Sequence, residues 1–241
     1  QFQGRNLVDL SQWMNWSWHR EEDRFAPRTA RLAIEWLEEN YLHHPFFLWV
    51  DFFDPHEPWD PPEYLVTRYD RSGYDGPPMI HPNYGPASAY SKKELANLAA
   101  HYAAELFLVN KWVGHVLRKI EELSLFDDTV VVFTSDHGYM FGHRGMKGKG
   151  AAQPIRNHTL DEDVFFVNMY DESFQVPLMI RWPGVVEGGR VIDELVSNVD
   201  FFPTFLRMVG IPVPAGLSLQ GKDFSPLLRG EDVSWSNVIF A

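Results

Sequence analysis

The sequence predicts an α/β protein in which helices flank a mainly parallel central sheet. Two nearly continuous apolar runs, residues 46–53 and 129–135, have the pattern of strands that are covered on both faces. Segments with helical periodicity alternate with these runs, which is typical of a doubly wound sheet. The chain has 241 residues, 45% of them apolar, which is enough for one large core, and we expect a single domain.

The first helix and the first strand follow one another directly. Residues 29–42 carry apolar side chains at three- and four-residue spacing with glutamates between them, which predicts a helix. A break at His44-Pro45 separates this helix from the strand at 46–53. Residues 57–90 are rich in Pro, Gly, Tyr and Asp without periodicity, so we expect a long functional loop there.

The second half of the chain continues the alternation of helices and strands. Ser91 and Glu94 have the spacing of a capping box, which predicts the start of a long amphipathic helix that ends near Leu123. The strand at 129–135 follows that helix. Three further elements are expected after it: a strand at 176–182, a helix at 198–209 and the beginning of a strand at 238–240.

Composition excludes several classes of partner. Asp and Glu number 33 against 21 Lys and Arg, so the formal net charge is −12 and the chain repels nucleic acid and anionic membranes. There is no Cys, which excludes disulfides, thiolate metal sites and a Cys nucleophile within the printed sequence. No apolar run approaches the ~20 residues that cross a bilayer, so no membrane span is expected. Any bound anion must be held by a few local cations.

Polar side chains follow the first two predicted strands. Ligands of open parallel sheets bind beyond the carboxyl ends of the strands. Asp136 and His137 come directly after the second strand, and a carboxylate beside an imidazole suits a divalent cation. The alternative is a turn in which Asp136 caps the backbone and His137 is an ordinary loop residue. The pair alone does not complete a metal site.

Four other residues are candidates for contact with a ligand. His56 lies between two prolines that fix its backbone, although a loop histidine bonded to the backbone is the common alternative. Lys147 and Lys149 belong to a Gly-rich basic loop at 143–150, which is the best candidate for binding an anion; a solvated loop is the alternative. Trp59 either lines a substrate cleft beside His56 or belongs to the core.

Taken in order, these motifs resemble those of the sulfatase family of the alkaline-phosphatase clan, over roughly residues 29–241. The resemblance implies an alkaline-phosphatase-like sandwich and a sulfuric ester hydrolase that cleaves a sulfate monoester by a metal-assisted formylglycine mechanism. It rests mainly on Pro45-Phe46-Phe47-Leu48, Asp54-Pro55-His56-Glu57-Pro58-Trp59, Trp112-Val113-Gly114, Thr134-Ser135-Asp136-His137-Gly138, Gly148-Lys149-Gly150, Tyr170-Asp171-Glu172-Ser173 and Ser225-Pro226-Leu227-Leu228-Arg229-Gly230.

The resemblance also implies roles for individual residues. Asp136 and His137 match the late pair of metal ligands, and His56 matches the histidine that lies near the bridging oxygen of the ester. Lys149 matches the lysine that holds a sulfate oxygen, and Lys147 is a second candidate for substrate contact. The implied metal is calcium; manganese and magnesium stay open, because imidazole is not a favoured ligand of so hard an ion. The implied substrate is a small-molecule or carbohydrate sulfate ester.

Two parts of the family's site are missing from the printed sequence. No Cys/Ser-x-Pro-x-Arg motif, from which formylglycine is made, occurs in it, so this chain supplies no nucleophile, and the early pair of metal-binding aspartates is missing too. The sequence starts without Met and stops within an apolar run, so both parts are expected upstream. We therefore expect residues 1–241 to be part of a sulfatase catalytic domain that is inactive by itself. The sequence indicates no compartment.

Two other functions remain open at this point. A phosphodiesterase or phosphonate monoester hydrolase of the same clan shares the Asp-His metal pair. A catalytically silent, anion-binding relative would have lost its nucleophile.

Overall fold

The computed structural model describes residues 7–81, 83–149, 154–157, 162–165 and 169–239. The chain divides into two compact units, and each is described by itself. Unit 1 comprises Gln1–Leu125 and His137–Val176, and unit 2 comprises Phe126–Asp136 and Pro177–Ala241. The single-domain interpretation stays a prediction.

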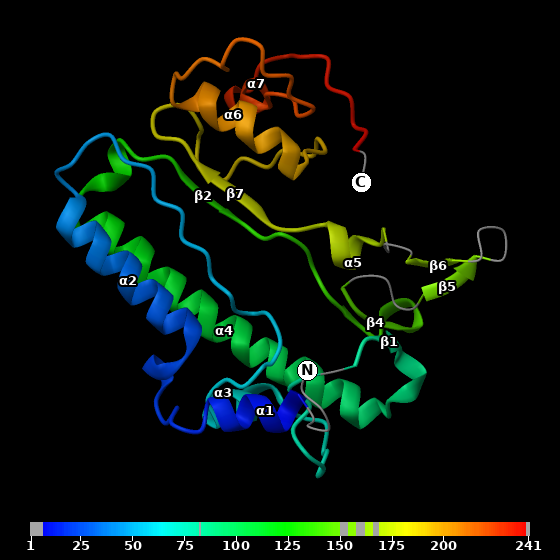
Figure 1. The fold of residues 1–241 in the computed structure, drawn as a ribbon. Helices are drawn as coiled ribbons and strands as arrows, with labels where there is room; N and C mark the ends of the chain where they lie inside the picture. The colour runs from blue at the N-terminus through cyan, green and yellow to red at the C-terminus, as the bar shows by residue number, and fades with distance from the viewer. Residues whose placement is uncertain (1–6, 82, 150–153, 158–161, 166–168, 240–241) are drawn as a thin grey trace. The chain divides into compact units, whose positions relative to one another are not determined.

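Three helices form the body of unit 1. The long helix α4 (Lys92–Glu122) packs against α2 (Phe25–Asn40) and α3 (Glu63–Tyr69) (Figure 1). Both long helices were predicted from their periodicity, and α2 begins earlier than expected. No helix in the described ranges is both long and apolar enough to cross a membrane. The residues buried between α3 and α4 are Leu65, Val66, Ala104 and Leu108.

The start of α4 is fixed by the predicted capping box. The Ser91 hydroxyl accepts a hydrogen bond from the Glu94 backbone N–H at 3.2 Å, and the Glu94 carboxylate accepts one from the Ser91 backbone N–H at 2.7 Å. Two backbone donors that have no partner within the helix are thereby satisfied.

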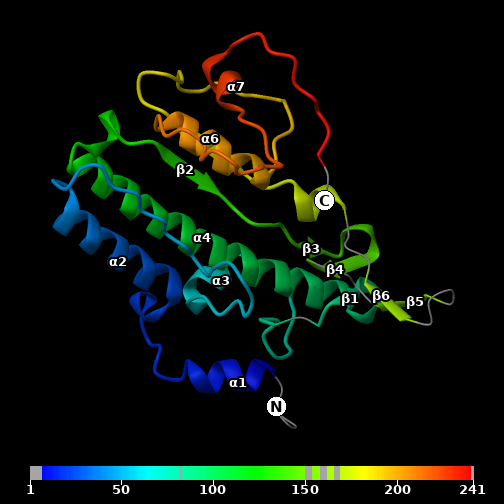
Figure 2. The same ribbon diagram turned by 45° about the horizontal axis from the view of Figure 1, so that its top comes forward.

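The other elements of unit 1 are short (Figure 2). A three-stranded antiparallel sheet has the order β1-β4-β3, and β5 pairs antiparallel with β6. The bounds are α1 (Leu7–Met14), β1 (Gly85–Pro86), β3 (Met140–Phe141), β4 (Met146–Gly148), β5 (Pro154–Asn157), β6 (Glu162–Phe165), α5 (Asp171–Phe174) and 3₁₀ turns at Glu21–Asp23, Ala87–Ala89 and His143–Gly145.

Unit 2 consists of a two-stranded ribbon and two helices. β2 (Val131–Thr134) pairs antiparallel with β7 (Leu178–Arg181). These strands and the helix α6 (Phe201–Met208), which follows a 3₁₀ turn, confirm three predicted elements with narrower bounds. A short helix, α7 (Ser225–Arg229), completes the unit. Its buried core residues are Met208, Phe224, Leu227 and Leu228.

Two predictions about strands differ from the structure. Residues 46–53 belong to no strand, although half-buried and exposed residues alternate along them as in an extended chain. Val238 and Ile239 likewise belong to no strand, and Phe240 lies outside the described residues. An apolar run favours extended structure, but a ladder also requires a neighbour for its backbone groups.

The direction of pairing also differs from the prediction. Each ladder among the described residues is antiparallel, so none of them confirms a mainly parallel sheet. The apolar pattern of residues 129–135 predicted burial, which does not fix the direction in which a partner runs. The broader prediction of a mixed α/β fold is confirmed.

Candidate active site

His56 is presented by the loop that follows residues 46–53. Its Nδ1 lies 2.6 Å from the Glu57 carbonyl oxygen. A carbonyl oxygen can only accept, so Nδ1 carries a hydrogen and donates it. Nε2 is therefore the ring nitrogen that can gain or lose a proton. The ring stacks on Phe53 with centroids 4.7 Å apart, and 41% of the side chain is exposed to solvent.

Trp59 anchors this loop from the core. Its side chain is fully buried, and the indole Nε1–H donates to the Pro55 carbonyl oxygen at 2.8 Å. The Trp59 backbone N–H donates to the Ile80 carbonyl oxygen at 2.8 Å. The placement agrees with the core alternative for Trp59, whereas a contact with substrate stays a prediction. The rings that surround the indole belong to Tyr102, Tyr139 and Phe141.

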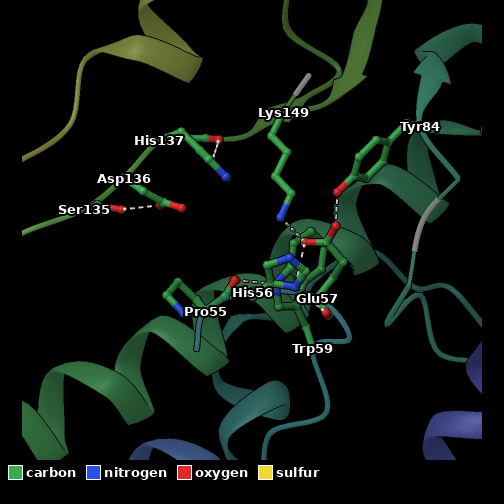
Figure 3. Close-up of polar contacts among 10 residues, drawn as sticks. Pro55, His56, Glu57, Trp59, Tyr84, Ser135, Asp136, His137 and Lys149 are labelled. Atoms are coloured by element: carbon green, nitrogen blue, oxygen red, sulfur yellow. Dashed lines mark hydrogen bonds and ion pairs between the residues drawn. The ribbon is translucent and has the colours of Figure 1, made fainter. Parts of the chain in front are cut away.

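The Glu57 carboxylate joins the two predicted catalytic residues. Its Oε2 lies 3.3 Å from the Lys149 ammonium and 3.6 Å from Nδ1 of His56 (Figure 3). The Tyr84 hydroxyl donates to the other oxygen, Oε1. Only 5% of the Glu57 side chain is exposed. Side chains from three segments of unit 1, at residues 56–57, 84 and 149, therefore meet at one buried carboxylate.

The charge state of this cluster follows from the same contacts. Burial by itself would raise the pKa of Glu57, but the hydrogen bond from Tyr84 and the positive charge of Lys149 lower it below its ordinary value. Burial and the hydrogen bond to Glu57 raise the pKa of Tyr84. At neutral pH, Glu57 is therefore an anion and Tyr84 a neutral donor.

The two lysines of the basic loop have different surroundings. Lys149 reaches Glu57 and keeps 16% of its side chain exposed. Lys147 is 2% exposed, and its ammonium lies 3.2 Å from the centroid of the Tyr90 ring. Gly148 separates them with a φ of 128°, which reorients the backbone between the lysines. The structure brings Lys149, but not Lys147, to the Glu57 cluster; a substrate contact of Lys147 stays a prediction.

Gly148 has a second role beside Tyr84. A Cβ atom at this position would lie 3.1 Å from Cγ of Tyr84, closer than most real contacts of that kind. The small residue therefore lets the Tyr84 ring lie against the backbone from which Lys149 extends.

Asp136 and His137 are consecutive and exposed at the end of the segment that contains β2. Asp136 ends the first segment of unit 2, and His137 resumes unit 1. Nδ1 of His137 lies 3.0 Å from the Gly138 carbonyl oxygen, so it donates there and leaves the lone pair of the neutral ring on Nε2. This tautomer and the Asp136 carboxylate fit a divalent cation as two of its ligands.

The backbone after this pair is fixed against α5. The Gly138 N–H donates to the Ser173 carbonyl oxygen at 2.8 Å. A Cβ atom at position 138 would lie 2.1 Å from the Glu172 carbonyl oxygen, so only glycine fits. Within the described ranges, no group of three or more His, Cys, Asp or Glu side chains is arranged to hold a metal ion. Asp136 and His137 would therefore need further ligands.

A buried pair of carboxyl groups lies at the base of the His56 loop. Asp54 and Glu105 are 6% and 3% exposed, and they share a hydrogen bond. The Asp54 carboxylate also accepts from the Ala26 N–H, at the start of α2, at 2.8 Å. Burial raises the pKa of Asp54 to about 6 and that of Glu105 well above its ordinary value, partly offset by the charge of Arg24.

The raised pKa values predict that stability falls as pH rises. Between about pH 5 and pH 6 the unfolded chain has released protons that the folded pair keeps, so the free energy of unfolding should drop by about 1.4 kcal/mol per pH unit for each retained proton. The variant Glu105→Gln cannot ionise at this position. The parent should lose stability as pH rises, and the variant should lose less. The unfolding temperature of Glu105→Gln minus that of the parent, measured from pH 5 to pH 8, should therefore increase with pH. The exposed Glu39→Gln serves as the control; a Glu105→Gln curve parallel to that of the parent would contradict the prediction.

Two residues of the cluster were not predicted as site residues. Glu57 is adjacent to His56, a predicted contact of the ligand, and an acidic residue at such a position is a signal for pairing with a cation. Tyr84 gives no such signal, because 27 residues separate it from Glu57 and its loop has no periodicity.

Comparison with known proteins places these motifs in a family. The family model described as Sulfatase matches residues 2–211. The arylsulfatase of Clostridium perfringens (strain 13 / Type A) is 26% identical over 96% of this chain and 48% of its own length. Human arylsulfatase K is 31% identical over 93% of this chain and 43% of its own length. The chain thus spans less than half of the length of these curated relatives.

A solved structure shows the same architecture. The phosphonate monoester hydrolase of Agrobacterium radiobacter superposes with a TM-score of 0.70 and 25% identity, over 90% of this chain and 44% of that chain. This similarity supports the predicted alkaline-phosphatase-like fold.

Proposed function

Because the chain belongs to the sulfatase family, we propose that it supplies part of the active site of an enzyme that hydrolyses sulfate monoesters by cleavage of the S–O bond. The observation that carries the proposal is the convergence of Lys149 and His56 on the buried carboxylate of Glu57. One residue carries an ammonium group and the other an imidazole that can donate a proton. These are the two functions that a departing alcohol and a charged sulfuryl group require.

His56 is the proposed general acid. Its Nδ1–H is committed to the Glu57 carbonyl oxygen, so the proton would leave from Nε2. As the S–O bond breaks, the bridging oxygen takes the bonding electron pair and accepts this proton, and the alcohol departs neutral. The nearby Glu57 carboxylate would stabilise the imidazolium form before the transfer.

Lys149 is the proposed ligand of a non-bridging sulfuryl oxygen. Glu57 holds its ammonium group in place, while part of the side chain remains accessible. Negative charge on the sulfuryl oxygens would then be balanced by a cation that needs little reorganisation during the reaction.

Sulfatases generally use a metal ion and a formylglycine. Asp136 and His137 would hold the metal as two of its ligands, and further ligands would have to come from other residues. Calcium is the metal that the family resemblance implies, and the imidazole donor leaves manganese or magnesium open. When present, the metal would polarise the sulfuryl oxygens and the formylglycine would provide the nucleophile.

The second candidate function is hydrolysis of phosphodiesters or phosphonate monoesters. The similarity to the phosphonate monoester hydrolase of Agrobacterium radiobacter favours it specifically. His56 and Lys149 would serve the same roles toward a phosphoryl group, because both classes of ester carry one negative charge.

A direct comparison of rates separates these functions. The intact protein should be assayed with an aryl sulfate and an aryl phosphodiester that share one phenol leaving group. We expect a higher kcat/KM for the sulfate. A higher value for the diester would favour the second candidate, and hydrolysis of neither would favour a catalytically silent relative.

A further inference from the structure

We propose that Glu57 is a specificity-determining residue that makes the site prefer esters with one negative charge over esters with two. This inference rests on the proposed function and deepens it. It concerns the charge of the substrate, so it applies to sulfate monoesters and phosphodiesters alike. The class of substrate that Glu57 would disfavour is the phosphate monoester.

The geometry places the Glu57 charge directly against the cation that binds the substrate. The 3.3 Å separation from the Lys149 ammonium is that of an ion pair, and the His56 ring lies on the same oxygen at 3.6 Å. Because 5% of the Glu57 side chain is exposed, solvent screens this charge weakly. The positive charge that Lys149 offers to a ligand is therefore partly compensated before a ligand arrives.

The groups that face Glu57 keep its carboxylate negatively charged at neutral pH, so it continues to offset the charge of Lys149. Burial and the neighbouring carboxylate raise the pKa of Tyr84. This phenol therefore stays neutral, and it holds one carboxylate oxygen by its hydrogen bond. Lys149 and His56 are the positively charged or protonatable groups that share the other oxygen.

The chemical consequence depends on the charge of the ester. A sulfate monoester and a phosphodiester carry one negative charge at every ordinary pH. A phosphate monoester gains a second charge above about pH 6. A second charge bound at Lys149 would be repelled by Glu57 in a partly desolvated site, which corresponds to a discrimination on the order of tenfold to a hundredfold. The other charged groups of the site are present in both the parent and the Glu57 variants. Their effect on the preference between the two esters therefore cancels when the parent and a variant are compared.

The test compares Glu57→Gln with Glu57→Asp in the intact protein. For each variant, kcat/KM is measured at pH 8 for an aryl sulfate and for the aryl phosphate monoester with the same phenol. Glu57→Gln should raise the ratio of phosphate to sulfate hydrolysis by roughly tenfold or more. Glu57→Asp, which keeps the charge, should keep the ratio even if both rates fall. Glu39→Gln controls for the change in net charge.

A ratio unchanged in Glu57→Gln would overturn the inference, because loss of positioning alone would lower both rates together. A binding measurement with the parent protein and with Glu57→Gln makes the test independent of turnover. The affinity for phenyl phosphate, divided by that for phenyl sulfate, should fall as pH rises through about 6. A ratio that stays constant or rises would also overturn the inference. If the parent hydrolyses neither ester, the proposed function fails, and the difference in this binding ratio between the parent and Glu57→Gln still decides the role of Glu57.

Discussion

Replacing Lys149 with alanine is expected to lower kcat/KM for an aryl sulfate by about 10²- to 10³-fold in the intact protein, the size of effect seen when one preorganised donor to a developing charge is removed. Glu57 holds the Lys149 ammonium group at 3.3 Å, beside the His56 ring, so the charge is fixed where the sulfuryl oxygens are proposed to bind. Alanine removes both the charge and the hydrogen-bond donor.

The fold should survive this change. Lys149 lies after β4 rather than in a helix, and its side chain is partly exposed, so the variant should still fold. Its unfolding temperature should be lower than that of the parent, because the buried Glu57 carboxylate loses its cation. Lys92→Ala, on the exposed first turn of α4, is the matched control for loss of a lysine. Full turnover in Lys149→Ala would remove this residue from the proposed site.

Replacing His56 with alanine should lower turnover by about 10²- to 10⁴-fold, the contribution expected of a positioned general acid. The variant loses the proton on Nε2 and leaves the Glu57 carbonyl oxygen without the donor at 2.6 Å. The loop itself remains anchored by Trp59, so unfolding is not the expected cause of the loss. Turnover is measured with an aryl sulfate and compared with His43→Ala, an exposed histidine beyond α2. Parent-level rates in His56→Ala would contradict the assignment.

These two predictions differ in their physical basis. Lys149 acts through a fixed charge, so its loss should reduce kcat/KM over the whole working pH range. His56 acts through a proton, so the rate of the parent should fall on the alkaline limb of the pH–rate profile as the imidazolium loses that proton. In the variant, this limb should change shape.

Local sequence patterns predicted the two long helices of this fold well, whereas α3 lies within residues 57–90, where a loop was expected. The periodicity of residues 29–42 and the capping box at Ser91 and Glu94 are local signals, and α2 and α4 follow them closely. The same holds for β2, whose β-branched run lies within a predicted strand. Residues 46–53 did not follow their pattern, because a strand depends on a partner that a local pattern cannot provide.

The sequence predicted only two of the four residues in the Glu57 cluster. His56 and Lys149 were predicted as site residues from their motifs, whereas the Glu57 carboxylate that joins them was not. Glu57 and Lys149 lie 92 residues apart, and no spacing rule indicates such a contact. Tyr84 comes from a third segment for the same reason. The composition of the basic loop did not distinguish Lys147 from Lys149, although the family resemblance favoured Lys149. The positive φ of Gly148, which turns the backbone between them, was not visible in the pattern.

The placement of Trp59 illustrates a related limit. A tryptophan in a polar, proline-rich loop is typical both of a cleft wall and of a core anchor. The bonds of its indole and backbone to Pro55 and Ile80 favour the anchor, because they hold the loop in the conformation that presents His56. The anchoring of this loop by Trp59 is thus sufficient to support the proposed role of His56.

The dependence of sulfate ester hydrolysis on the leaving group tests the proposed site most directly. A series of aryl sulfates whose phenols range from strongly to weakly acidic should be assayed with the intact parent protein and with His56→Ala. If His56 protonates the bridging oxygen as the S–O bond breaks, the loss in the variant should be small for the most acidic phenols and should grow steadily as the phenols become poorer leaving groups. A loss of equal size across the series, or no hydrolysis of any aryl sulfate by the parent, would contradict the proposed function of this chain.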